Sequence, residues 1–293
     1  MSITTQEDVP SPKLINTMNA MSILQREYSF KGVIIASSPN VTDYALALNL
    51  TVIKEVESNP YGLPFLNSII NSSKSLFNAS FYGYMNSDIL LNPLIIKEMT
   101  LVKEAIDNGL LVPPLMIGSR VGNINIHENM ISNLTIESYF KAVSNLSEEV
   151  RMRSPTGCDI FIYTPTYPLH LIANAVVGRR WIDYIATSHP HSLGLTLVDI
   201  SEAAIHYHQG FDNYRLHTRK KEERDVLWNR NIRKTQLYTL READYRLCPN
   251  LTFIIPNYKN NVTCNRIYDV YHKQMESTKT DYMILLIRSH RTE

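Results

Sequence analysis

The chain has 293 residues, and its 29 Lys and Arg nearly balance its 28 Asp and Glu. This balance gives no electrostatic reason to bind nucleic acid or an anionic membrane, so we expect neither as a partner. The length suits one large α/β domain or two small ones, of which we favour one, and the 44% hydrophobic content is that of an ordinary globular domain. No apolar run approaches the roughly 20 residues that span a bilayer, so no membrane segment is expected in this chain.

Strands and helices alternate along the first 90 residues. Residues 1–28 are predicted as an N-terminal extension that is polar and then weakly helical. The apolar runs that follow predict strands at 30–36, 51–53 and 80–84 and helices at 43–50 and 66–76. This alternation is typical of crossover helices joining parallel strands, so we expect a Rossmann-like α/β fold with a mainly parallel central sheet flanked by helices.

The segment 80–91 is the most informative part of this half. It runs an aromatic strand into a single carboxylate, Asp88, and then returns to apolar residues. A charge between apolar runs costs several kcal/mol unless it is paired, hydrogen-bonded or bound to a cation. We expect Asp88 at the C-terminal edge of its strand, where open α/β sheets collect ligands; a residue that caps the following helix or turn is the alternative.

The second half continues the pattern, and 206–214 adds a dense polar and aromatic segment. The predicted elements are helices at 94–108, 129–150 and 219–224, the second and third of them exposed, strands at 115–120, 158–163 and 195–200, and a strand-turn-helix start at 175–184. The segment 206–214 reads as the lip of a site, although a structural role is the alternative for each of its histidines. We expect one domain over 29–255 and a tail, 256–293, packed on it.

Glycosylation patterns and cysteines bear on the compartment. Eight asparagines begin Asn-x-Ser/Thr: Asn40, Asn49, Asn71, Asn78, Asn133, Asn145, Asn250 and Asn261. This density favours a glycoprotein of the secretory lumen, in the Golgi or the ER, or a secreted one, whose targeting segment is absent from this chain; a cytoplasmic protein is the alternative. Cys248 and Cys264 are candidates for a disulfide worth about 3 kcal/mol, and three reduced thiols are the alternative.

Three short motifs, taken in order, resemble those of a family of nucleotide-diphospho-sugar transferases with the GT-A fold. They are M-N-S-D-I-L-L at 85–91, V-V-G-R-R-W-I-D at 176–183 and H-Y-H-Q-G-F-D-N-Y at 206–214. They match an N-x-D variant of the D-x-D motif, a Gly-Arg segment followed by an acidic residue, and a His-Gln pair followed by Tyr. The resemblance spans about 30–217.

The resemblance implies a role for each matching residue. Asp88 would hold Mn²⁺ or Mg²⁺ on the donor diphosphate, and His208 would complete the metal shell. Asn86, which stands in place of the first Asp, would bind the donor together with Gly178 and Arg179. Asp183 would be the general base that removes the proton of an acceptor hydroxyl.

The expected function is therefore a glycosyltransferase that moves a sugar from a nucleotide-diphosphate donor to a glycan or protein acceptor. A bound cation and Arg stabilise the leaving diphosphate, and a carboxylate deprotonates the attacking hydroxyl. The alternative from another class is a catalytically inactive GT-A-like module that binds sugars or a protein, because Asn86 replaces a carboxylate. A cytosolic nucleotidyltransferase is a third possibility, but 37–40 lacks a Gly-rich or Lys-bearing phosphate loop.

Overall fold

The computed structural model describes residues 1–126, 129–146, 150–152, 158–201, 205–210, 223–235, 250–256, 269–272 and 282–288. Several sequence predictions fall outside these ranges. They concern the paired cysteines Cys248 and Cys264, the glycosylation site at Asn261, the segment 211–214 and most of the helix expected at 219–224. They stay predictions.

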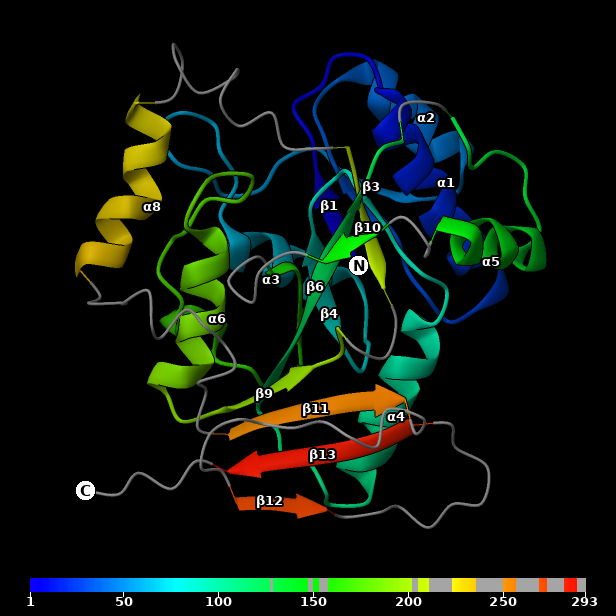
Figure 1. Ribbon diagram of the computed structural model, residues 1–293. Coiled ribbons are helices and arrows are strands. Elements are labelled where there is room, and N and C mark those ends of the chain that lie inside the picture. The colour runs from blue at the N-terminus through cyan, green and yellow to red at the C-terminus, as the bar shows by residue number, and fades with distance from the viewer. Residues whose placement is uncertain are drawn as a thin grey trace.

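A single curved sheet forms the centre of the molecule (Figure 1). Its strand order is β12-β13-β11-β9-β6-β8-β4-β1-β2-β3, and along this path β8 and β13 run against the other strands. The predicted α/β class with a mainly parallel sheet is thereby confirmed. The strands are β1 (Ser2–Thr4), β2 (Val33–Ile35), β3 (Thr51–Ile53), β4 (Tyr82–Met85), β6 (Leu115–Ile124), β8 (Cys158–Tyr163), β9 (Thr196–Asp199), β11 (Asn250–Pro256), β12 (Asp269–His272) and β13 (Tyr282–Arg288).

Helices cover both faces of the sheet. Because the side chains of a strand alternate between its two faces, each strand contributes to the apolar core on both sides. Within β2, Ile34 packs into one apolar cluster, whereas Val33 and Ile35 pack into another. Helices α1 (Pro12–Glu27), α2 (Pro39–Ala47) and α4 (Ile95–Asp107) contribute to the first cluster, and α3 (Leu66–Leu76) and α6 (Ile182–Ser192) contribute to the second. Figure 1 shows α1 and α2 on one side of the sheet and α6 on the other.

Strand β1, for which the sequence pattern gave no prediction, lies inside the sheet between β2 and β4. Its first residue, Ser2, is opposite both Val33 of β2 and Tyr84 of β4, and its central residue, Ile3, is fully buried. Three residues are too few to show a period of two, which explains the miss. Residues 1–28, expected as an extension, thus provide a strand of the central sheet and the buried helix α1. The domain limits at 28 and 255 stay predictions.

Strand β6 is the point at which three further strands branch off the main path of the sheet. Its first half pairs with β8 and β9, a register shift falls at Ser119 and Arg120, and its second half pairs with β10 (His206–Gln209) and β7 (Arg151–Met152). The other edge of β10 pairs antiparallel with β5 (Ile89–Leu90). This bend carries the segment around His208 to the end of β4.

The remaining predictions agree in part with the structure. Within the segment 256–293, expected as a tail packed on the domain, strand β13 pairs with β11 near one end of the sheet. The helix expected at 129–150 is shorter, α5 (Ile136–Asn145), and it buries Tyr139 and Val143 while Phe140 stays exposed. Helix α8 (Glu223–Thr235) packs near α6.

Surface and compartment features can be read where the structure describes them. Six of the eight glycosylation-pattern asparagines are exposed: Asn40, Asn49, Asn71, Asn78, Asn133 and Asn145. Cys158 is a free, buried thiol. Among the described helices, none has the length and apolar character needed to cross a membrane.

Candidate active site

A cavity of about 450 Å³ opens at the edge of the sheet where β1 and β4 end and β8 begins. Its lining includes every residue that the sequence analysis proposed for the site: Asn86, Asp88, Gly178, Arg179, Asp183 and His208. The other lining residues are Thr4, Tyr84, Ser87, Asp159, Arg180, Trp181, Ile182 and Tyr184. The structure therefore brings together residues from three distant segments, while their chemical roles stay predictions.

The pairing of β5 with β10 places Asp88 beside His208. Asp88 lies in the turn between β4 and β5, and the next residue, Ile89, is opposite His208 in the antiparallel pair. The main-chain oxygen of Asp88 accepts hydrogen bonds from the main-chain nitrogen of Gln209 at 3.0 Å and from its side-chain amide at 3.3 Å. As a result, His208 Nε2 lies 3.1 Å from Asp88 Oδ2.

The hydrogen bond made by Nδ1 of His208 determines whether Nε2, on the cavity side, carries a hydrogen or a lone pair. His208 Nδ1 is 3.1 Å from the carbonyl oxygen of Gly210, which only accepts, so Nδ1 carries the hydrogen. In the neutral ring, Nε2 then directs a lone pair toward the Asp88 carboxylate. Two lone pairs this close need a proton or a cation between them.

The Asp88–His208 pair fits a hard divalent cation. Neighbouring ligands of an octahedral ion with bonds of about 2.0–2.1 Å lie about 3 Å apart, close to the separation of Nε2 and Oδ2. Within the described ranges, no set of three or more His, Cys, Asp or Glu side chains is arranged to hold a metal. A cation held by these two residues would therefore keep positions for water and for oxygens of a bound ligand, as Mg²⁺ commonly does.

Asp159 is a site residue that the sequence analysis missed. It is 3% exposed, and its Oδ1 accepts a hydrogen bond of 2.8 Å from the side-chain amide of Asn86. The sequence predicts a strand at 158–163 but not its direction. Because β8 is antiparallel to β4, its beginning lies at the edge where β4 ends, and only this direction brings Asp159 to the cavity.

The pKa of Tyr84, which lines the cavity, is affected by the charged residues around it. Burial is the main cause that raises the pKa of its phenol, and the negative charges of Asp88, Asp159 and Asp183 raise it further, whereas a hydrogen bond with the Thr4 side chain opposes the shift. Tyr84 therefore stays protonated, and its hydroxyl donates a hydrogen bond of 3.3 Å to Asn86 Oδ1. Three carboxylates thus act on one buried hydroxyl.

The segment 178–181 lines the cavity with two arginines and has an unusual backbone. Gly178 has φ of +68°, and Trp181, directly before α6, has φ of +77°, which is rare for a bulky side chain and typical of strained functional segments. Arg180 and Arg233 of α8 lie over the Trp181 ring, with guanidinium carbons 5.5 and 4.3 Å from its centroid. This turn places Asp183 in the first turn of α6, facing the cavity beside Arg179.

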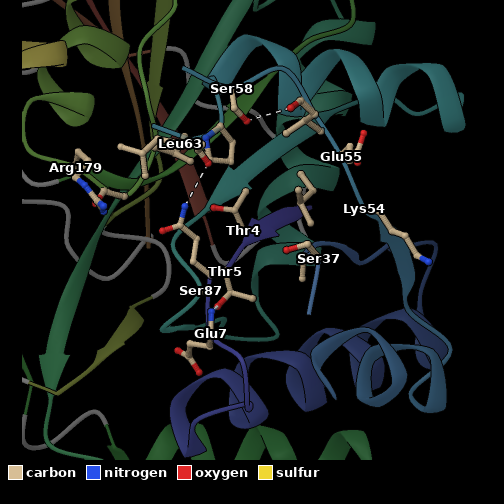
Figure 2. Close-up of a pocket in the computed structure, with 18 residues that line it drawn as sticks. Thr4, Thr5, Glu7, Ser37, Lys54, Glu55, Ser58, Leu63, Ser87 and Arg179 are labelled. Carbon is tan, nitrogen blue, oxygen red and sulfur yellow. Dashed lines mark hydrogen bonds between the residues drawn. The ribbon is translucent and has the colours of Figure 1, made fainter. Parts of the chain in front are cut away.

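A second, polar pocket of about 620 Å³ adjoins the first and shares Thr4, Ser87, Gly178 and Arg179 with it. Figure 2 shows Arg179 and Lys54 on opposite sides of this pocket, with Thr4, Thr5 and Ser87 between them. Ser37 also lines it, at the point where β2 ends. The two pockets together form a continuous polar surface along the ends of parallel strands, the position at which open α/β sheets bind ligands.

Comparisons with known proteins identify no family for the chain. No family model matches it, and no curated protein sequence matches it. Among solved structures, it is similar to glucosyl-3-phosphoglycerate synthase from Mycobacterium tuberculosis in complex with Mn²⁺, UDP-glucose and phosphoglyceric acid. That match has 12% identity and a TM-score of 0.40 and covers 79% of this chain and 78% of that chain.

A second similar structure is described only as a mycobacterial protein. It has 13% identity and a TM-score of 0.39 and covers 98% of this chain and 82% of that chain. At such identities and TM-scores, these likenesses assign no function to the chain, and its function has to be argued from its own site.

Proposed function

We propose that this chain is a metal-assisted glycosyltransferase that moves a sugar from a nucleotide-diphosphate donor to a hydroxyl of a glycan or protein acceptor. The observation that carries the proposal is the approach of Asp88 and His208 to 3.1 Å on the wall of a cavity that Asp183 and Arg179 also line. This cavity opens into a second polar pocket large enough for a nucleoside.

Each group has a chemical task in this reaction. Asp88 and His208 would hold Mn²⁺ or Mg²⁺, which supplies positive charge against the diphosphate. Arg179, shared by both pockets, would bind the donor phosphates, and Asn86 would contact the donor beside them. Gly178 allows the backbone turn that presents Arg179. Asp183 would remove the proton of the acceptor hydroxyl as the hydroxyl attacks.

An inactive GT-A-like module that binds sugars or a protein is the second candidate. It is favoured by Asn86, which replaces one of two carboxylates and is itself bonded to Asp159. The two candidates differ in what they require: a transferase needs the cation and releases a nucleoside diphosphate, whereas a module binds its ligand without turnover.

Incubating the purified chain with a panel of nucleotide sugars and Mn²⁺ separates these candidates. We expect one donor to release its nucleoside diphosphate, and EDTA to stop the release, because the leaving group then loses its counter-charge. Release is measured by anion-exchange chromatography, with protein-free and EDTA arms as controls. Donor binding that is indifferent to EDTA and yields no diphosphate would establish the inactive module instead.

We further propose that the protein works in the secretory lumen or is secreted. The support is the exposure of the six glycosylation-pattern asparagines in the described ranges. Expressed with a secretion signal in a eukaryotic cell, the chain should carry N-glycans at several of these positions. Treatment with a glycan-removing amidase would then increase its gel mobility by several glycan masses, and unchanged mobility would favour the cytoplasm.

A further inference from the structure

The side chain of Asn86 is held between a donor and an acceptor on the cavity wall. Its amide nitrogen donates to Asp159 Oδ1 at 2.8 Å, and its oxygen accepts from the Tyr84 hydroxyl at 3.3 Å. Thr4 hydrogen-bonds in turn to Tyr84. These four residues come from β1, β4, the end of β4 and β8, and all four line the same cavity. The orientation of the amide is therefore set by its neighbours.

Asp159 is the ionic end of this chain of hydrogen bonds. It is 3% exposed, and burial of a carboxylate at this level requires a donor or a positive charge nearby. The Asn86 amide is one such donor. A carboxylate at position 86 would instead place two acidic groups at the hydrogen-bonding distance of 2.8 Å, where both cannot be ionised at once.

We infer that Asp159 supplies the carboxylate that the N-S-D segment lacks, and that it is the positioning residue for Asn86. A D-x-D motif would have a carboxylate at position 86, and here the facing strand β8 provides one in Asp159. Asparagine suits position 86 because its amide can donate a hydrogen bond to that carboxylate. Asp159 fixes the amide and adds its negative charge to the wall of the cavity that Asp88 also lines, without being a ligand of the cation itself. This inference rests on the proposed function.

The exchange can be tested by moving the charge back. In Asn86→Asp/Asp159→Asn the donor and the acceptor swap strands, so the hydrogen bond and the net charge are both retained. The single variant Asp159→Asn leaves two amides and no carboxylate in this pair, and Asn86→Asp leaves two carboxylates and no amide. Asp43→Asn, on the exposed side of α2, is the matched control for loss of one carboxylate. Each protein is titrated with Mn²⁺, first alone and then with UDP or GDP, by calorimetry, and its thermal unfolding is recorded without metal.

We expect Asp159→Asn to weaken Mn²⁺ affinity by about tenfold or more, which corresponds to about 1.4 kcal/mol, and the double variant to return to within about threefold of the wild-type affinity. Asn86→Asp should lower the thermal stability of the metal-free protein, because it places two carboxylates at the 2.8 Å distance of the present hydrogen bond. Asp43→Asn should bind like the wild type. A purely structural role of Asp159 would lower the thermal stability of Asp159→Asn but leave the Mn²⁺ affinity of the folded protein unchanged.

Two results would overturn the inference, and they are distinguishable. If the wild type binds Mn²⁺ with a nucleoside diphosphate and Asp159→Asn binds it equally well, or the double variant stays as weak as Asp159→Asn, Asp159 has no part in the cation site. If the wild type itself binds no Mn²⁺ under any of these conditions, the proposed function fails and the inference fails with it. Should Asp159→Asn not fold, the double variant alone decides between these outcomes.

Discussion

Replacing Asp88 by Ala is expected to abolish Mn²⁺-dependent donor binding and to lower donor turnover by a factor on the order of 10³ or more, since cation stabilisation of charge in the transition state is worth several kcal/mol. The variant should not disturb the pairing of β5 with β10, because the hydrogen bonds from Gln209 use the main-chain oxygen of residue 88, which alanine retains. His208 keeps its bond to Gly210, so one ligand of the cation remains correctly oriented.

Isothermal titration with Mn²⁺ and the nucleoside diphosphate measures the binding loss, and diphosphate release measures turnover. His208→Ala should weaken the same two quantities, and Asp43→Ala should change neither. If Asp88→Ala binds Mn²⁺ with the diphosphate as the wild type does, Asp88 and His208 are not the cation ligands, and their proximity is an ion pair without a cation.

Replacing Asp183 by Asn is expected to leave donor affinity nearly unchanged and to lower turnover by a factor on the order of 10² to 10⁴. Asparagine keeps the size of the side chain and its position in the first turn of α6, but it cannot take a proton from the acceptor. The main-chain oxygen of Asp183, which accepts from Thr187 at 2.6 Å, is unaffected by the change, so the helix start is preserved.

Turnover is measured with the donor found in the panel, with water or an added acceptor, and donor affinity is measured by the Mn²⁺–diphosphate titration. Tyr184→Phe, which alters the neighbouring lining residue without removing a carboxylate, is the control. A loss of affinity that accounts for the whole loss of rate would make Asp183 a donor-binding residue, and unchanged turnover would remove it from the reaction.

Local sequence pattern was sufficient for most elements around the site, although the strand expected at the start of 175–184 is only an isolated bridge at Val176. The aromatic strand before Asp88 lies where the sequence placed it, and the helix after Gly178 and Arg179 begins within the predicted segment, because period and turn residues carry that information. The order of the three motifs, added to these elements, was enough to select six residues that now line one cavity.

Strand direction and pairing could not be predicted in this way. Asp159 was read only as part of a strand, since an apolar run is the same whether the strand runs with or against its neighbour. Strand β1 was missed because three residues carry no usable period, although pairing on both sides makes Ser2–Thr4 part of the sheet. Both errors concern contacts between distant segments, which a single sequence does not record.

The pairing of β5 with β10 also bears on how the protein folds. It joins residues as far apart as Asp88 and Gln209, 121 positions along the chain, and the entropy of closing a loop this long has to be met before its contacts add stability. Contacts of such long range tend to form late. The strands that end at Thr4, Ile35 and Met85 can assemble from the first 90 residues, whereas the pairing of His208 with Asp88 has to wait until residue 208 has been made. A nascent chain would thus form the Asp88–His208 pair only after this first part of the sheet, so shorter chains would carry the sheet edge without the proposed cation site.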